Sequence, residues 1–589
     1  MILFSKQTTT DGQQRPRRKV GCLGGCLIFF AVYFICSAIL GWILGDTFSS
    51  STVELKDQTV YRLQLKGTLV EQGQEDNPFA SLMGSMPYSS YAQDETVGLD
   101  NILSNIRLAK NDDRILGIWL DGGSLSMAPA SAKAIRDALL DFKTSGKWII
   151  ASAKNYGEAN YYVASVADRI CIDPTGSVDW KGLVAQKMYY TRVMEKLGIE
   201  MQILKVGTFK SAVEPYFRTS MSDADRQQTK EYLDGLWTEY KSAVSASRAI
   251  SVEQLDALAD RVMGIQSAEE NLKAGLVDTI VYTQDIDSLL RIFTGTKDYK
   301  TLTTAKLAQV KRPESKAKDK VAVVYMEGTI TEEDGDGIVA KDVIKTLKKI
   351  RKDDDVKALV LRVNSPGGSA DASEQIWHAI QNIKADSIPV VVSMGDYAAS
   401  GGYYISCGAD YIFAEPTTIT GSIGIFGTIP DASKLRDKIG LDIDGITTNK
   451  HSDMDYMVLK GMTSEETAMM QAMVERGYDL FTRRCAEGRH VSQDYIKSIG
   501  EGRVWLGNKG KEIGIVDEMG NIDNAIAKAV EMAGLEFYTL AYYPDVVDPW
   551  EEILKAFDNT TDEEKLMLKV KEFCSQPRIM ALMPEVEIK

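Results

Sequence analysis

The chain has 589 residues, of which 44% are hydrophobic and 26% charged, so it is long enough to bury more than one globular core. Its formal net charge of −15 argues against a general nucleic-acid binder, because phosphate recognition needs lysine and arginine clustered on one face. The seven cysteines form no CxxC pair and no cluster with histidine, so the sequence predicts neither a metal site nor a disulfide framework.

A basic segment over residues 1–20 precedes an uncharged, apolar run over residues 21–44. The run can cross a hydrocarbon core of ~30 Å at ~1.5 Å per helical residue, whereas the apolar part of a signal peptide is usually only ~7–15 residues long. We therefore expect residues 21–44 to be a retained, single-pass transmembrane helix. The positive-inside rule keeps residues 1–20 in the cytoplasm and places the rest of the chain on the other side.

The chain beyond this helix contains one order of elements twice. Tyr161 recurs as Tyr403 and Lys196 recurs as Lys438, each 242 residues later and each within a matching local pattern. In both copies, short strands rich in valine and isoleucine alternate with segments of helical period. This alternation predicts an α/β fold in which helices pack on a largely parallel sheet.

The repeat predicts two tandem domains joined by a polar linker. An insertion over residues 72–96 has no counterpart in the second copy, and we expect it to be either a surface loop or a contact segment. The apolar stretch Ile579–Pro584 either packs against a neighbouring subunit or reaches toward the active site. The expected boundaries are 53–305 for the first copy, 306–320 for the linker, 321–540 for the second copy and 541–589 for a C-terminal tail.

Ser400 is the candidate nucleophile. It lies in the stretch Asp396–Ile405, between an apolar strand-like run over residues 388–393 and residues spaced for a buried helix face. A hydroxyl at a helix N-terminus is near unpaired N–H groups and a dipole that favours developing negative charge. The alternative is a small-residue turn in which Ser400 only caps the helix.

The two copies differ at this position. The residue that lies 242 before Ser400 is Glu158, so the first copy cannot supply an equivalent nucleophile. In the second copy, Gly367 and Gly368 follow a predicted strand, where glycine lets the backbone approach a ligand closely. They are candidates for an oxyanion hole, and a plain tight turn is the alternative.

A serine needs a base to become nucleophilic at neutral pH, and histidine is the usual one. The chain has only three histidines. His378 lies in a helical pattern and His490 in a polar turn, which favours surface positions for both. His451 follows the core of the second copy and stays a candidate.

Lysine is the alternative base. Lys210 follows an apolar, strand-like run and lies close to Phe209, Ala212 and Val213. Apolar surroundings can lower the pKa of a lysine from ~10.4 toward ~7–8, as a neutral general base requires. The other interpretation is a solvated surface lysine.

Together these motifs resemble the signal peptide peptidase A family, peptidase family S49, in its long, two-copy, membrane-anchored form. The resemblance covers nearly the whole chain and implies two tandem Clp-protease/crotonase-like domains after a transmembrane helix. It also implies a Ser/Lys dyad, with Lys210 from the first copy and Ser400 from the second. Its most specific points are Val206–Pro215, Asn364–Ser369, Tyr397–Tyr404 and Thr420–Gly424.

The implied reaction is peptide hydrolysis through an acyl-enzyme, without a metal or any other cofactor. Backbone N–H groups of Gly367, Gly368 and Gly401 would hold the oxyanion, and Ser422 is a further candidate for orienting Lys210. Single-copy members carry the lysine in the same copy as the serine. Here Lys450 matches that position only with a two-residue slip, so we expect Lys210 to be the base and neither copy to be active alone.

The resemblance also implies a cellular role. Members degrade remnant signal peptides at the bacterial inner membrane as a homotetramer, so we expect apolar peptide substrates, catalytic domains in the periplasm and bilayer contact through residues 21–44. No nucleic-acid partner is expected. Two rivals stay open: a crotonase-type acyl-CoA hydratase or isomerase, which also uses an oxyanion hole, and a non-catalytic membrane scaffold.

Overall fold

A computed structural model describes residues 53–73, 96–312, 315–335, 337–544, 580–583 and 587–588. The predicted transmembrane helix lies outside these residues, as do most of the insertion and most of the C-terminal tail. Within the ranges given, no helix is both long enough and apolar enough to cross a membrane.

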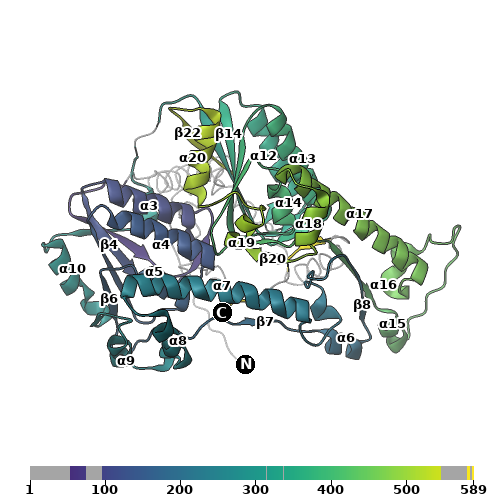
Figure 1. Cartoon of the computed structure of the whole chain (residues 1–589), viewed down its shortest axis with the longest axis horizontal. Helices are drawn as coiled ribbons and strands as arrows, with labels where there is room; N and C mark the ends of the chain where they lie inside the picture. Colours follow the sequence, from purple (N-terminus) through teal and green to yellow (C-terminus); the bar gives the residue numbers. More distant parts are fainter. Residues whose placement is uncertain are drawn as a thin grey trace, which may run out of the picture. The chain divides into compact units, whose positions relative to one another are not determined.

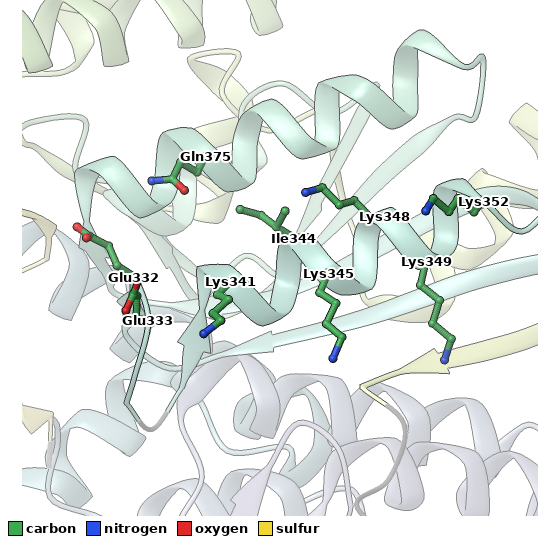
Figure 2. A pocket seen from close by; sticks show the side chains of 9 residues that line it. All are labelled: Glu332, Glu333, Lys341, Ile344, Lys345, Lys348, Lys349, Lys352 and Gln375. Carbon is green, nitrogen blue, oxygen red and sulfur yellow. The ribbon is translucent and has the colours of Figure 1, made fainter.

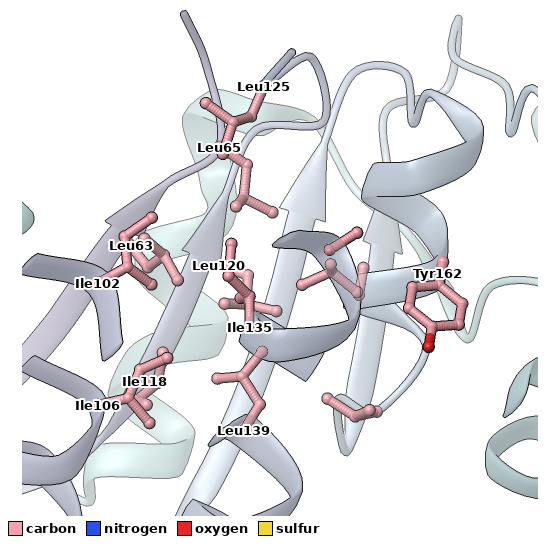
Figure 3. Close-up of a cluster of buried hydrophobic side chains, with 14 of the residues drawn as sticks. Leu63, Leu65, Ile102, Ile106, Ile118, Leu120, Leu125, Ile135, Leu139 and Tyr162 are labelled. Atoms are coloured by element: carbon pink, nitrogen blue, oxygen red, sulfur yellow. The ribbon is translucent and has the colours of Figure 1, made fainter. Parts of the chain in front are cut away.

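The first copy forms a six-stranded parallel sheet in the order β10-β1-β4-β5-β6-β9. Apolar side chains from the strands meet those of α3 and α4 in one buried cluster, for example Leu63 and Ile118 against Ile102 and Ile135 (Figure 3). The elements are β1 Thr59–Gln64, β4 Ile115–Asp121, β5 Trp148–Ala153, β6 Arg169–Ile172, β9 Thr279–Ile280, β10 Lys300–Thr303, α3 Leu99–Asn111, α4 Pro129–Lys143 and α5 Glu158–Ala164.

The second copy repeats this arrangement in a sheet of order β20-β18-β16-β14-β11-β22, with β17 and β21 attached through β16. Its central strands β14 and β16 are buried at all but a few positions, which explains their valine-rich sequence. The elements are β11 Lys320–Glu327, β14 Val356–Ser365, β16 Val390–Ala399, β17 Tyr411–Ala414, β18 Ile419–Gly421, β20 Val504–Leu506, β21 Glu518–Met519, β22 Thr539–Tyr543, α12 Ala340–Arg351, α13 Ala370–Ala385 and α14 Gly401–Ser406.

Two predicted boundaries fall inside elements. Strand β22 continues to Tyr543 and pairs with β11, so the second sheet extends three residues beyond the expected end at 540. Helix α11, Thr304–Ala308, spans the expected start of the linker. The repeat itself is followed closely: α6 covers Thr191–Leu197, and α15 covers Ser433–Ile439, with both ends 242 residues apart.

A third sheet joins the two copies, which the sequence did not predict. Its order is β13-β12-β15-β23-β19-β8. Strand β8 of the first copy, labelled in Figure 1, runs antiparallel to β19 of the second. The described residues of both copies form one compact unit. The strands are β8 Glu200–Lys205, β12 Ile330–Thr331, β13 Ile338–Val339, β15 Gly367–Ser369, β19 Phe426–Asp431 and β23 Met580–Leu582, and helices α7 Asp223–Arg248 and α17 Ser464–Arg489 follow β8 and β19 in their copies.

Candidate active site

Ser400 lies at the junction between β16 and α14. Its backbone has φ 56° and ψ −114°, a conformation that a non-glycine residue rarely adopts. The Ser400 N–H donates to the Gly421 carbonyl at 2.8 Å, and its own carbonyl accepts from the Tyr404 N–H at 2.8 Å. The Ser400 side chain makes no capping hydrogen bond, so its hydroxyl is not bound to the helix N-terminus.

Lys210 reaches this hydroxyl from the first copy. Its Nζ lies 2.7 Å from Ser400 Oγ, 3.1 Å from Ser422 Oγ and 3.2 Å from the Ser422 carbonyl oxygen. All three residues are fully buried. The structure therefore brings three residues singled out from the sequence within hydrogen-bond distance of one another.

The position of Lys210 depends on the third sheet, which joins the two copies. Strand β8 pairs with β19, and the pairing continues where the Val206 N–H donates to the Ile425 carbonyl. The Phe209 N–H then donates to the Glu501 carbonyl at 2.9 Å. A Cβ on Gly502 would lie 2.6 Å from the Lys210 Cβ, so only glycine at 502 leaves room for the lysine.

Burial controls the charge of Lys210. Loss of solvent holds the pKa of its amine well below the ordinary value for lysine. Desolvation is the one cause of this shift, and the centroid of the Phe426 ring lies 5.9 Å from Nζ. A neutral amine 2.7 Å from Ser400 Oγ can accept the proton of the Ser400 hydroxyl.

The other candidate bases lie elsewhere. His378 is exposed on α13, and His490 is exposed at the end of α17. His451 lies 3.4 Å from Glu465 and from Glu466, and Lys450, which is 70% exposed, pairs with Glu465. The described residues show no contact between any of them and Ser400.

The candidate oxyanion glycines surround a peptide carbonyl. Strand β15 pairs antiparallel with β23, which places Gly368 opposite Ala581. A Cβ on Gly367, whose φ is 105°, would lie 1.9 Å from the Ala581 carbonyl oxygen and 2.7 Å from the Gly401 nitrogen. The Gly367 N–H itself donates to Ser365 Oγ at 3.2 Å. Gly401, beside Gly367, and Gly368, paired with Ala581, are therefore the glycines that border this carbonyl with no side-chain partner given for their N–H groups.

The chain's own tail lies beside these glycines. Of the two interpretations of the Ile579–Pro584 stretch, its described residues, 580–583, fit the one in which it reaches toward the active site. Strand β23 lies between β15 and β19. Ala581 is fully buried, and Met583 packs in an apolar cluster. That cluster combines the first copy with the second: Tyr232, Leu236, Ala399, Ile419, Val504 and Leu506.

A buried ion pair behind the site was not predicted. Glu71 of the first copy accepts from Arg362 at 2.8 Å and from Asn364 Nδ2 at 2.9 Å. Asn364 Oδ1 in turn accepts from the Tyr397 N–H at 3.0 Å, three residues before Ser400. Glu71 lies next to the insertion, and no local pattern in the sequence indicates a partner 291 residues away.

A pocket along α12 is separate from the candidate catalytic residues. It has a volume of about 890 Å³ and lies along α12, with an ammonium-rich lining (Figure 2). None of the candidate catalytic residues lines it. Its lining residues are Glu332, Glu333, Lys341, Ile344, Lys345, Lys348, Lys349, Lys352 and Gln375.

Comparisons with known proteins agree with the repeat. Peptidase family S49 matches residues 141–293 and 382–536, and Clp protease matches residues 313–419. "Protease 4" of Salmonella typhi is 37% identical over 82% of this chain and 80% of its own. "Protease 4" of Haemophilus influenzae is 32% identical over 86% of this chain and 84% of its own. "Serine protease SPPA, chloroplastic" of Arabidopsis thaliana is 29% identical over 74% of this chain and 66% of its own.

Proposed function

The chain belongs to peptidase family S49 and is a serine protease, and on that basis we propose that Ser400 and Lys210 form its catalytic dyad. The observation that supports this assignment is the 2.7 Å separation between Lys210 Nζ and Ser400 Oγ. Both side chains are buried, and burial lowers the pKa of the Lys210 amine. Each S49 segment supplies one member of the dyad, since Lys210 lies in 141–293 and Ser400 in 382–536.

The reaction follows from this geometry. Lys210 takes the hydroxyl proton as Ser400 Oγ attacks the scissile carbonyl, and the amides of Gly368 and Gly401 stabilise the oxyanion. The Lys210 ammonium then gives its proton to the leaving amine. Lys210 next takes a proton from water as the water oxygen attacks the acyl-enzyme carbonyl, and the resulting ammonium returns that proton to Ser400 Oγ as the ester C–O bond breaks. The Ser422 hydroxyl and carbonyl accept hydrogen bonds from the ammonium and keep it oriented.

The pairing between β15 and β23 supports peptides over acyl-CoA esters as substrates. Strand β23 already pairs with β15 as a peptide would, with a backbone carbonyl beside Gly401. The apolar cluster around Met583 suits an apolar side chain. The proposal has four further parts. The substrates are remnant signal peptides, and both domains are crotonase-like. Residues 21–44 attach the chain to a membrane, and the catalytic domains form a homotetramer in the periplasm.

The test is hydrolysis combined with labelling. We expect the full chain to cleave an apolar signal-peptide sequence and a serine-reactive fluorophosphonate to label Ser400. The matched control is Ser400→Ala, which should show neither. Turnover of crotonyl-CoA without labelling would identify the hydratase or isomerase. Normal cellular function of Ser400→Ala would identify the scaffold.

The tail strand should act as a tethered competitor. Deleting residues 580–589 is expected to raise kcat/KM for a short apolar peptide by roughly 10-fold, because a tethered segment has an effective concentration in the millimolar range. The peptide acetyl-Met-Ala-Leu-Met-amide should inhibit the truncated chain more strongly than the full chain. Steady-state kinetics of both chains measures this. A truncated chain with lower kcat/KM and lower Tm would show that the segment is only structural.

A further inference from the structure

The pocket along α12 is lined by lysines from one face of that helix. Four of them recur at intervals of four, three and four residues, so their side chains project from the same face (Figure 2). All four are exposed, and none forms an ion pair with a residue in the ranges that the structure describes. Ammonium groups gathered in this way attract an anionic partner. The four are Lys341, Lys345, Lys348 and Lys352.

The two ends of the α12 pocket carry opposite charge. Beside the N-terminal end of α12, Glu332 and Glu333 line the pocket, and the exposed Asp334 follows them. From Lys345 onward the charged lining is basic, as Figure 2 shows. A partner that fits the whole pocket therefore needs acidic groups toward one end and basic groups toward the other.

Each end of the pocket lies next to a described part of the C-terminal tail. At the basic end, Lys349 Nζ lies 5.3 Å from the centroid of the Tyr543 ring, at the end of β22. At the acidic end, Ser369 Oγ donates to Glu332 Oε1 at 3.0 Å, and Ser369 pairs with Met580 at the start of β23. The chain between Tyr543 and Met580 therefore starts at one end of the pocket and finishes at the other.

The length of this connecting segment permits a path along α12. The helix has 12 residues and is therefore ~18 Å long at ~1.5 Å per residue. An extended chain covers ~3.3 Å per residue, so residues 544–579 can follow the whole helix and still have chain to spare.

The charges of the segment follow the same order as those of the pocket, with opposite sign. Residues 545–564 contain eight acidic residues and one lysine, Lys555. Residues 565–579 contain four basic residues and one glutamate, Glu572. The acidic part is joined to β22 at the basic end of the pocket, and the basic part leads into β23 at the acidic end. The two charge patterns are complementary from end to end.

We propose that residues 545–579 of the same chain dock in the α12 pocket, with 545–564 on the lysine face and 565–579 toward Glu332 and Glu333. A single exposed ion pair adds little affinity. The segment is nevertheless joined to the fold at both ends of the pocket, which gives it an effective concentration in the millimolar range. This tether favours the segment over a free anionic partner or a second copy of the chain.

Docking would also act on the active site, and this part of the inference rests on the proposed function. A docked segment leaves less free chain before Met580, which raises the effective concentration of β23 beside Gly367 and Gly368. Replacing two pocket lysines, Lys345→Glu with Lys348→Glu, should therefore raise kcat/KM for a short apolar peptide about 3-fold. The two changes should have no effect once residues 580–589 are deleted. An equal rise in the truncated chain would contradict the link to β23.

Cross-linking tests the docking without using peptidase activity, so its failure would leave the proposed function standing. The sample is the full chain with Ser400→Ala, purified in a mild detergent and treated with a carbodiimide, which joins a lysine amine to a carboxylate in contact with it. Mass spectrometry should find links from the lysines of 341–352 to the acids of 545–564. A mixture of isotope-labelled and unlabelled chains should show that these links lie within one chain.

Two other outcomes of the cross-linking would overturn the proposal. Links that join labelled to unlabelled chains would identify a second copy as the occupant. An absence of links to 545–564 would leave the pocket to a free anionic partner, such as a phospholipid headgroup.

Charge reversal tests the complementarity by amide hydrogen exchange of residues 545–564 in the same chain. Lys345→Glu with Lys348→Glu should speed this exchange at least 5-fold, and adding Glu551→Lys with Glu552→Lys should restore the slower rate. Salt at 1 M should also speed it, because the Debye length falls to about 3 Å. The matched control reverses two exposed lysines of the first copy, Lys154→Glu with Lys297→Glu, and should change nothing. Equal exchange in the wild type and the pocket variant would overturn the proposal.

Discussion

Replacing Ser400 with alanine is expected to lower kcat/KM for an apolar peptide by roughly 10⁴- to 10⁶-fold, the range seen when a serine nucleophile is removed. The only side-chain hydrogen bond that Ser400 makes in the described structure is with Lys210, so we expect its loss to leave the fold intact. The Tm should therefore stay within about 2 °C of the wild type. Steady-state kinetics and thermal unfolding measure the two effects.

Ser406→Ala is the matched control for Ser400→Ala. Ser406 is a second fully buried serine in α14, and its hydroxyl donates to the Gly402 carbonyl at 2.7 Å. Its removal should cost some stability, about 1 kcal/mol, and little activity. If Ser400→Ala kept more than a few per cent of wild-type activity, the nucleophile would have to be another residue.

Replacing Lys210 with methionine should reduce kcat/KM by a similar factor, at least about 10⁴-fold, because the residues of a catalytic unit act together. Methionine keeps the length and apolar stem of lysine but cannot accept a proton. Lys450→Ala is the control, and we expect its kcat/KM to stay within about 2-fold of wild type because Lys450 lies on the surface beside Glu465. The reverse outcome, with Lys450 essential and Lys210 dispensable, would rule out the cross-copy dyad.

Replacing Lys210 with methionine should also change how the stability of the protein depends on pH. Burial places the pKa of Lys210 in the folded protein below its unfolded value of ~10.4, so between these two pKa values the unfolded chain binds more protons. Stability therefore rises with pH across that window, and the catalytically competent neutral amine becomes populated in the same direction. Lys210→Met should raise Tm near neutral pH and remove this part of the pH dependence. A fall in Tm would show that the amine stabilises the fold.

Local sequence patterns predicted the two α/β copies, the buried strands and the position of Ser400 at a strand-to-helix junction. The repeat was equally informative, because Glu158 at the matching position showed which copy could hold a nucleophile. Lys210 was predicted as the general base from its apolar neighbours and from the scarcity of histidine. The family resemblance favoured Lys210 over Lys450.

What could not be predicted depends on pairings between distant segments. Strand β8 has an ordinary amphipathic pattern, and nothing in it indicates that its partner is in the other copy. Glu71 and Arg362 become partners only through the fold. The positive φ of Ser400 likewise has no sequence marker, since serine, unlike glycine, gives no sign of that backbone conformation.

The sequence separation of 190 between Lys210 and Ser400 affects when the two residues become available during biosynthesis. At about 5–20 residues per second, a ribosome needs roughly 10–40 s to add the serine after the lysine. The second sheet also needs β22, which ends at Tyr543, before β11 has both neighbours. Throughout synthesis of the first copy the emerging polypeptide lacks Ser400, so a partly made chain has no peptidase activity that depends on this serine.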